Sequence, residues 1–252
     1  MPAASAPGLT VVGVGPGDPE LITVAAQRAI RAAAVLAYPV AAVERSGMAA
    51  TIAAPWISPE QQPLPLVFPM VEEAQPRREA WHAAAAAVAA QVQAGRSVVF
   101  LCEGDSSLYA SASYLLMALR QRHPQCPQRV IPGITAAAAA AAAVSTAIEP
   151  WPLALQQEPL LIQPTPDQPE QLRQLLMQCQ ATGQPLVLLK LGRRWRWVRP
   201  LLQELGLLEQ AMYAERVGWP EQQLCRAAQL PADERPYFSL LLLRPTWPEV
   251  LP

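Results

Sequence analysis

Glycines gather at three points of the chain where an apolar run ends and a helical pattern begins. The three glycine loops are Gly13-Val14-Gly15-Pro16-Gly17-Asp18, Glu103-Gly104-Asp105-Ser106-Ser107-Leu108-Tyr109 and Ile131-Pro132-Gly133-Ile134-Thr135-Ala136. The run before the first loop is rich in β-branched residues, as is typical of a buried strand. Ligands of open α/β sheets bind at the carboxyl ends of strands. Three such loops therefore predict one binding crevice, but they do not specify its chemistry.

The first loop is similar to a dinucleotide-binding fingerprint, but it departs from that fingerprint in three ways. The third glycine is replaced, and Pro16 removes an amide that could face a phosphate. The next strand pattern ends at Tyr38-Pro39 without an acidic residue to hold a ribose. Asp18 would also repel a pyrophosphate at the start of a helix. These departures argue against NAD binding, and a tight turn without a ligand is the plainer alternative.

The second loop allows two interpretations. Gly104 lets a ligand approach the backbone closely, and Asp105 offers an acceptor to an amine or a hydroxyl group. Alternatively, Asp105 or Ser106 caps the helix that we expect over residues 108–122. The residues alone leave both interpretations open.

The elements that would position these loops alternate between strand and helix patterns in the first half of the chain. We expect strands at 9–14, 35–38, 97–102 and 129–131, and helices at 19–34, 77–94, 108–122 and 134–144. Pro39 should stop the second strand, and the proline-rich residues 55–76 should be extended, with an edge strand at 64–69. This alternation predicts a mainly parallel sheet. The almost pure alanine run at 134–144 predicts a helix packed too closely for larger side chains.

The composition changes after the alanine run, where Pro150 and Pro152 interrupt the chain. We therefore place a domain boundary between residues 148 and 149. The second half should hold strands at 160–163, 185–189, 211–215, 223–226 and 238–243, and helices at 168–182 and 198–206. Strands in direct succession near the end predict a mixed sheet. The expected fold class is α/β, with domains at 1–148 and 149–252.

Composition limits the classes of function. The 252 residues suffice for one large domain or two modest ones, and 52% of them are hydrophobic. A net charge of −1 with 15% charged residues argues against non-specific binding to nucleic acid or anionic membranes. No apolar run approaches the ~20 residues of a membrane span, and the first residues lack the basic segment of a secretory signal. We therefore expect a cytoplasmic protein.

Cysteine and histidine usage predicts no metal site. The four cysteines lie far apart in or beside apolar runs, without a Cys-x-x-Cys pair, and are expected to be reduced, buried thiols. His82 and His123 are the only histidines, which excludes a histidine-rich site and disfavours zinc. Neither histidine lies in a nucleophile motif, and Gly-x-Ser-x-Gly is absent.

Taken together, the three glycine loops resemble the tetrapyrrole (corrin/porphyrin) methylase family. The first signature of that family appears here as Val12-Gly13-Val14-Gly15-Pro16-Gly17-Asp18-Pro19-Glu20-Leu21-Ile22-Thr23. The second appears as Glu103–Tyr109 and the third as Pro132–Ala136, in the same order and spacing. The resemblance extends from residue 9 to residue 243, nearly the whole chain.

Within this family, other segments resemble the precorrin-2 C-20 methyltransferases. These segments are Phe68-Pro69-Met70, Arg77-Arg78-Glu79-Ala80-Trp81, Leu188-Leu189-Lys190, Glu215-Arg216 and Pro236-Tyr237-Phe238-Ser239. Uroporphyrinogen methylases instead carry a double glycine before the aspartate and an arginine-glycine pair after it, where this chain has Glu103 and Ala110-Ser111. Most family members have proline after the aspartate. Ser106 at that position occurs in C-20 enzymes and leaves the loop less rigid.

The resemblance implies two α/β domains with a cleft between them, S-adenosylmethionine as methyl donor without a metal, and a homodimer. It implies methyl transfer to C-20 of the tetrapyrrole precorrin-2, giving precorrin-3A in cobalamin synthesis, without nucleic-acid or membrane partners. The implied cofactor-binding residues are Pro16, Gly104, Asp105, Leu108, Thr135, Ala136, Lys190, Arg216 and Tyr237. The implied substrate contacts are Gly15, Asp18 and Tyr109. No residue can be named for removal of the meso proton.

Several alternatives stay open at this stage. The substrate could carry cobalt, another tetrapyrrole could be methylated, or the chain could be an inactive relative that only binds a tetrapyrrole or the cofactor. The stretch Lys190–Arg199, with Arg193, Arg194 and Arg196 beside two tryptophans, could recognise substrate carboxylates. It could equally begin an amphipathic surface helix. RNA binding, known for one branch of the family, is disfavoured by a single basic stretch on a chain of net charge −1.

Overall fold

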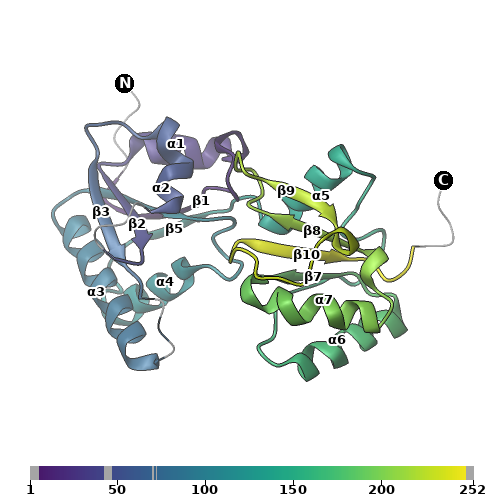
Figure 1. Cartoon of the computed structure of the whole chain (residues 1–252). Coiled ribbons are helices and arrows are strands. Elements are labelled where there is room, and N and C mark those ends of the chain that lie inside the picture. Colours follow the sequence, from purple (N-terminus) through teal and green to yellow (C-terminus); the bar gives the residue numbers. More distant parts are fainter. Residues whose placement is uncertain (1–5, 43–46, 70, 72, 248–252) are drawn as a thin grey trace. The chain divides into compact units, whose positions relative to one another are not determined.

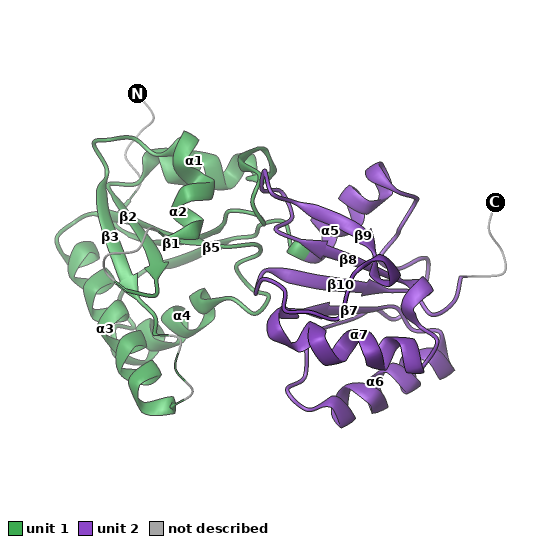
Figure 2. Ribbon diagram, in the orientation of Figure 1, with its two compact units in different colours: residues 1–136 green, residues 137–252 purple. Residues whose placement is uncertain are grey.

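The computed structural model describes residues 6–42, 47–69, 71 and 73–247. They divide into two compact units, which we call the first unit (residues up to Ala136) and the second unit (from Ala137) (Figure 2). Met70, part of a segment that the sequence resemblance used, lies outside the described residues.

The first unit is a five-stranded parallel sheet with helices on both faces (Figure 1). Its strands, in the spatial order β3-β2-β4-β1-β5, are β1 (Gly8–Gly13), β2 (Val35–Val40), β3 (Gln62–Val67), β4 (Ser97–Cys102) and β5 (Gln128–Ile131). Its helices are α1 (Val24–Ala32), α2 (Met48–Ala53), α3 (Ala74–Gln93) and α4 (Ser111–Arg122). The prediction of a mainly parallel sheet with an edge strand near residues 64–69 is confirmed.

Some element boundaries in the first unit were predicted wrongly. Strand β2 continues through Pro39 because only its first three residues pair with β4, so that beyond Ala37 it pairs on one side, with β3. The helix expected at 19–34 is divided into a 3-10 turn, Pro19–Leu21, and α1. Thr23 separates the two because its hydroxyl accepts the N–H of Ala26 and caps α1. Helix α2 had no counterpart in the sequence prediction.

The second unit contains a mixed five-stranded sheet, as predicted. In the spatial order β6-β7-β10-β8-β9, its strands are β6 (Leu161–Pro164), β7 (Leu186–Leu189), β8 (Ala211–Glu215), β9 (Gln223–Arg226) and β10 (Ser239–Leu243). Strand β6 runs parallel to β7, whereas β10 is antiparallel to both β7 and β8. Helices α6 (Pro169–Thr182) and α7 (Trp195–Glu204) cover one face, and α5 (Ala136–Ala147) lies on the other (Figure 1).

The division between the units falls at the first residue of the alanine helix α5, whereas the sequence placed a boundary after the helix, at 148/149. The segment after α5 is tied to the second unit by its own contacts. Trp151 N donates to Ser145 Oγ at 2.8 Å. Glu149 pairs with Arg226 at 2.8 Å, and Glu158 accepts from the buried Arg244 at 2.7 Å. These contacts join α5 and the segment that follows it to strands β9 and β10.

All four cysteines are free thiols. Burial raises the pKa of Cys102 to about 12, so this thiol stays protonated at neutral pH. Within the described part of the chain, no helix combines the length and the apolar character that crossing a bilayer requires.

Candidate cofactor and substrate site

The three glycine loops of the first unit meet at one sheet edge. Strand β1 lies between β4 and β5, all parallel, so that their carboxyl ends are neighbours. A Cβ placed on Gly13 would lie 2.6 Å from Gly133 N and 2.7 Å from Gly104 O. Gly15 and Gly104 also form an isolated bridge, with N···O distances of 3.1 and 2.8 Å. The predicted convergence of the loops is therefore confirmed, and bare backbone lines the point where they meet.

Asp105 joins the second loop to the third. The residue is 9% exposed, and its Oδ2 accepts the N–H of Gly133 at 2.9 Å. Its Oδ1 accepts from both the N–H and the hydroxyl group of Ser107. Burial alone would raise the Asp105 pKa, but these hydrogen bonds outweigh burial and hold the pKa below its ordinary value.

Neither Asp105 nor Ser106 caps helix α4, so the capping interpretation was wrong. The N-cap of α4 is Ala110, which offers no side-chain oxygen, and Ser106 Oγ donates to Ile131 O at 3.1 Å. The helix begins at Ser111, later than predicted. Residues 103–110 therefore form a loop that is organised by its own polar side chains and by the third glycine loop.

Glu103, which the sequence interpretation used only as part of a motif, is a half-buried acid at the start of the second glycine loop. Burial raises the pKa of its carboxyl group, and a hydrogen bond from the backbone N–H of Ala49 partly counteracts this rise. Ala49 lies in the first turn of α2, an element that the sequence prediction missed. An acid directly after a buried strand was the signal that could have identified Glu103.

The remaining predicted residues of the first unit lie in or beside the loops. Asp18 Oδ1 accepts the N–H of Glu20 at 2.8 Å, so this proposed substrate contact caps the 3-10 turn. Pro16 and Leu108 are half-buried. Thr135 and Ala136 stand half-buried at the start of α5.

The predicted residues of the second unit also come together, at the end of the sheet where β7 and β8 finish and β10 begins. Lys190 and Arg216 directly follow β7 and β8, and the antiparallel β10 starts beside them. The Lys190 Nζ lies 5.8 Å from the centre of the Tyr237 ring. Arg216 N donates to Phe238 O at 2.9 Å. Tyr237 and Phe238 are 42% and 43% exposed, so aromatic surface is available there.

Three of the predicted site residues adopt a backbone conformation that is rare outside glycine. Tyr109, Lys190 and Arg216 have φ angles of 53°, 59° and 48°. Among the described non-glycine residues, only Gln156 shares this feature, with a φ of 47°. Left-handed conformations of bulky residues cost about 1–2 kcal/mol each and cluster at ligand sites. They turn the backbone amide and carbonyl groups of the strand ends away from the direction of the sheet.

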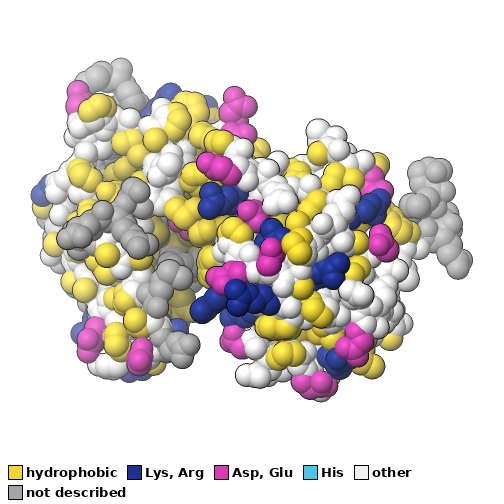
Figure 3. Space-filling view, viewed as in Figure 1, with side chains coloured by type: hydrophobic (Ala, Val, Ile, Leu, Met, Phe, Trp, Pro, Cys, Tyr) yellow, Lys and Arg dark blue, Asp and Glu magenta, His cyan; other side chains and the backbone are white. Residues whose placement is uncertain are grey.

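Most arginines of the stretch 190–199 form ion pairs or hydrogen bonds within the second unit. Arg194 pairs with Asp167, and Arg196 lies 3.2 Å from Glu234. Arg199 donates to the carbonyl oxygen of Leu230, and Trp195, the first residue of α7, is fully buried. On the face in Figure 3, basic and acidic side chains alternate over this unit. These contacts favour the amphipathic-helix interpretation over recognition of substrate carboxylates.

Comparisons with known proteins agree with the motifs. The family model described as Tetrapyrrole (Corrin/Porphyrin) Methylases matches residues 8–230. A precorrin-2 C(20)-methyltransferase from Sinorhizobium sp. is 36% identical over 244 residues, 94% of each chain. A cobalt-precorrin-2 C(20)-methyltransferase from Salmonella typhimurium is 30% identical over 95% of this chain and 97% of the relative.

A solved structure shares the fold. It is the uroporphyrin-III C-methyltransferase from Thermus thermophilus, complexed with S-adenosylhomocysteine, with a TM-score of 0.60. The two chains are 19% identical, and the match covers 94% of this chain and 92% of the other.

Proposed function

The chain belongs to the tetrapyrrole (corrin/porphyrin) methylase family, and from this membership we propose that it methylates C-20 of precorrin-2. The methyl donor is S-adenosylmethionine, and the product is precorrin-3A, an intermediate of cobalamin synthesis. The observation that carries the proposal is the 36% identity to a precorrin-2 C(20)-methyltransferase over 94% of both chains. The family model, which matches residues 8–230, covers the three glycine loops as well as Lys190 and Arg216.

The residues present fit S-adenosylmethionine. The contact of Gly13, Gly104 and Gly133 leaves an edge without side chains, where backbone groups can approach a ligand. The exposed Tyr237 and the left-handed Lys190 and Arg216 offer an aromatic ring and reoriented backbone groups, which suit an adenine. We propose that Pro16, Gly104, Asp105, Leu108, Thr135 and Ala136 hold the cofactor in the first unit. Lys190, Arg216 and Tyr237 would do so in the second.

Asp105 acts in this proposal by holding the loops in place. Because both of its oxygens already accept hydrogen bonds from the loops, its main effect is to fix Gly104 against the third loop. Gly15, Asp18 and Tyr109 remain our candidates for contacts with the tetrapyrrole. Tyr109 is 48% exposed.

The main catalytic task of the protein in this reaction is to align the methyl donor with the tetrapyrrole. S-adenosylmethionine supplies an activated methyl group, and a reduced tetrapyrrole meso carbon is electron-rich. Orientation of two reactants can contribute roughly 7–11 kcal/mol to catalysis. The loops and strand ends described above would provide that orientation by fixing backbone groups. The group that removes the meso proton stays unassigned.

Cobalt-precorrin-2 is the second candidate substrate, because a cobalt-precorrin-2 enzyme is also similar, at 30% identity over 97% of its length. We favour the metal-free substrate because the identity to the precorrin-2 enzyme is higher, at 36%. We also propose a cytoplasmic homodimer that needs neither nucleic acid nor membrane. These two features rest on the family resemblance and on the composition of the chain.

The proposal is tested by mass spectrometry of the product. Protein incubated with S-adenosylmethionine and precorrin-2 should add one methyl group, and isotope labelling should place it at C-20. A parallel reaction with cobalt-precorrin-2 separates the two substrates by their kcat/KM values. Calorimetry with S-adenosylhomocysteine provides a separate measure of cofactor binding. Cofactor binding without methylation of either substrate would instead support an inactive, ligand-binding relative.

A further inference from the structure

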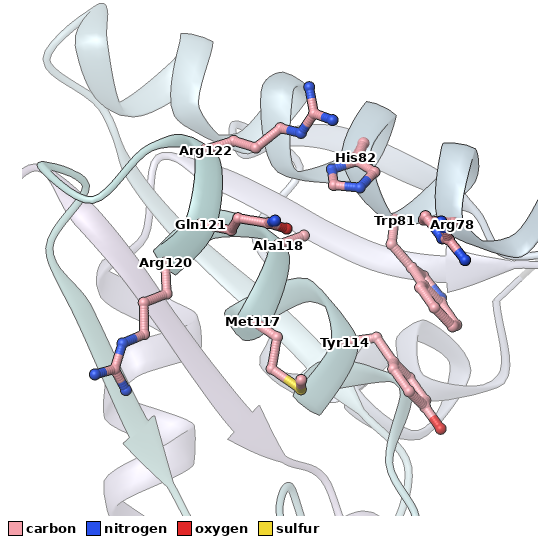
Figure 4. A pocket seen from close by; sticks show the side chains of 9 residues that line it. All are labelled: Arg78, Trp81, His82, Tyr114, Met117, Ala118, Arg120, Gln121 and Arg122. Atoms are coloured by element: carbon pink, nitrogen blue, oxygen red, sulfur yellow. The ribbon is translucent and has the colours of Figure 1, made fainter.

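A pocket of about 810 Å³ lies between α3 and α4 on the first unit (Figure 4). Its lining residues are Arg78, Trp81, His82, Tyr114, Met117, Ala118, Arg120, Gln121 and Arg122. None of the predicted cofactor or substrate residues lines it. The volume falls in the range of about 300–1,000 Å³ that is usual for small-molecule sites.

The pocket exposes aromatic and apolar surface. The rings of Trp81 and Tyr114 are stacked, with centroids 4.2 Å apart and planes 2° from parallel. Tyr114 is 47% exposed and Met117 is 68% exposed, both on the outer side of α4. Stacked rings beside a flexible thioether suit a flat, conjugated ligand.

The polar lining is cationic. Arg78, Arg120 and Arg122 form no ion pair with any other described residue, and no carboxylate lines the pocket. The neighbouring acid on α3, Glu79, accepts a hydrogen bond from Gln75 instead. In addition, the buried Nδ1 of His82 has no hydrogen-bond partner among the described residues. Unpaired guanidinium groups beside apolar surface suit an anionic ligand.

We propose that this pocket is a second binding site for a tetrapyrrole polycarboxylate, separate from the site of methyl transfer. The aromatic and apolar lining would contact the ring system, and the three arginines would bind carboxylates at its edge. The choice of a tetrapyrrole as the ring system rests on the proposed function. The inference that the ligand is flat and carries several negative charges rests on the residues that line the pocket.

The spacing of the arginines favours a polycarboxylate over a nucleotide. Figure 4 shows their three guanidinium groups standing apart around the pocket, without a common point toward which they converge. A nucleotide concentrates its charge on one phosphate chain, which converging donors bind best. A tetrapyrrole carries its acetate and propionate groups around the rim of the ring, which matches separated cations.

The test compares two double variants of the full chain by equilibrium dialysis, with uroporphyrin III as the probe and S-adenosylhomocysteine present at saturation. The pocket variant is Arg78→Ala with Arg122→Ala. The control is Arg28→Ala with Arg129→Ala, which removes two exposed arginines of the same unit that lie outside the pocket. We expect the pocket variant to bind the porphyrin at least about tenfold more weakly than the control, and salt to reduce this difference. The rate of precorrin-2 methylation at low substrate should be the same in both.

Equal porphyrin binding by the two variants would overturn the proposal. Displacement of the porphyrin by an equal concentration of ATP would also overturn it, and would assign the pocket to nucleotides. A change of oligomeric state in the pocket variant alone, measured by sedimentation, would identify a self-association surface instead. If neither the parent protein nor the variants methylate precorrin-2, but porphyrin binding still depends on Arg78 and Arg122, the second site would be supported and the proposed function would be contradicted.

Discussion

Asp105 shows how one buried carboxylate can hold two loops of a proposed ligand site together. It accepts from Gly133 N through one oxygen and from Ser107 through the other, so it joins loops that follow β4 and β5. Such a carboxylate has no easy substitute, because three donors converge on it. The sequence predicted its importance, but it did not predict that its partners belong to the protein.

Asp105→Asn should therefore lower the free energy of unfolding by about 1–3 kcal/mol at neutral pH, because the amide nitrogen would face a donor. The folded-state pKa of Asp105 lies below its ordinary value of 3.8. The contribution of Asp105 to the free energy of unfolding is therefore present above pH 3.8. It is lost as the pH falls through the lower, folded-state pKa. Urea unfolding near pH 7 and near pH 3 should show the difference between variant and parent shrinking in acid.

Asp18→Asn is the matched control for that substitution. The Asp18 carboxylate accepts a hydrogen bond from Glu20 N, which an asparagine oxygen can also accept. We expect a change of less than about 0.5 kcal/mol. The role assigned to Asp105 would be contradicted if Asp105→Asn lowered the free energy of unfolding by as little as this. It would also be contradicted if the decrease were the same at both pH values.

Glu103 has the opposite pH dependence. Because burial raises its pKa above the ordinary value of 4.5, the folded state favours the neutral carboxyl group. The contribution of the neutral Glu103 to the free energy of unfolding is fully present below pH 4.5. It is lost as the pH rises through the folded-state pKa. Glu103→Gln should therefore be more stable than the parent at about pH 8 and equally stable at about pH 4. Thermal unfolding across this range measures the effect, and the exposed Glu60→Gln should show no such trend.

The left-handed residues mark the limit of what single residues reveal in a sequence. Lys190 and Arg216 were chosen by resemblance, and nothing in their side chains indicates a positive φ. Both residues directly follow strands that pair with the antiparallel strand β10. Such constraints come from tertiary pairing, and a pattern of residue types along the chain does not contain them.

At the scale of elements, strand prediction succeeded where burial is complete on both faces. Strand β4 has the predicted bounds, and all six of its residues are buried. Prediction failed where an element depends on its neighbours. The missed helix α2 has only six residues, and the predicted start of α4 was displaced by a loop held through Asp105. Short elements of this kind are stabilised by partners distant in sequence.

The meeting of the three strand ends predicts a strict requirement for glycine at position 13. A Cβ there would lie 2.6 Å from the backbone of Gly133, so the strand ends would have to separate. Gly13→Ala should cost about 3 kcal/mol and weaken binding of S-adenosylhomocysteine. Urea unfolding and calorimetry measure the two effects. As the comparison, Gly206→Ala, at a φ of +70° with nothing within 4 Å, should cost only about 1–2 kcal/mol.

The alanine helix α5 gives a second prediction at this scale. Ala140 is 0% exposed, whereas Ala142 is exposed on the same helix. Ala140→Leu should destabilise the protein by about 1–3 kcal/mol because a close-packed site must expand. Ala142→Leu should change the free energy of unfolding by no more than about 0.5 kcal/mol. Equal effects of the two substitutions in urea unfolding would show that the helix is not closely packed.

At the scale of the whole molecule, two compact units each carry their own sheet, their own core and part of the predicted cofactor contacts. The sequence predicted two domains but placed the change after α5, because the prolines at 150 and 152 suggested a linker. Those residues instead belong to a segment that Arg244 and Arg226 anchor to the second sheet. Proline content alone did not distinguish a linker from an anchored, extended segment.

If both units contribute to cofactor binding, S-adenosylhomocysteine should slow hydrogen exchange in both. The amides of β1, β4 and β5 report on the first unit, and those of β7, β8 and β10 report on the second. At a hundredfold excess over its Kd, a ligand that binds only the folded state adds about 2.7 kcal/mol of stability. For amides that exchange only through global unfolding, this corresponds to about a hundredfold slower exchange. Slower exchange confined to the strands of the first unit would mean that Lys190, Arg216 and Tyr237 do not bind the cofactor. A ligand that does not bind the second unit would not stabilise it and would leave its amide exchange unchanged.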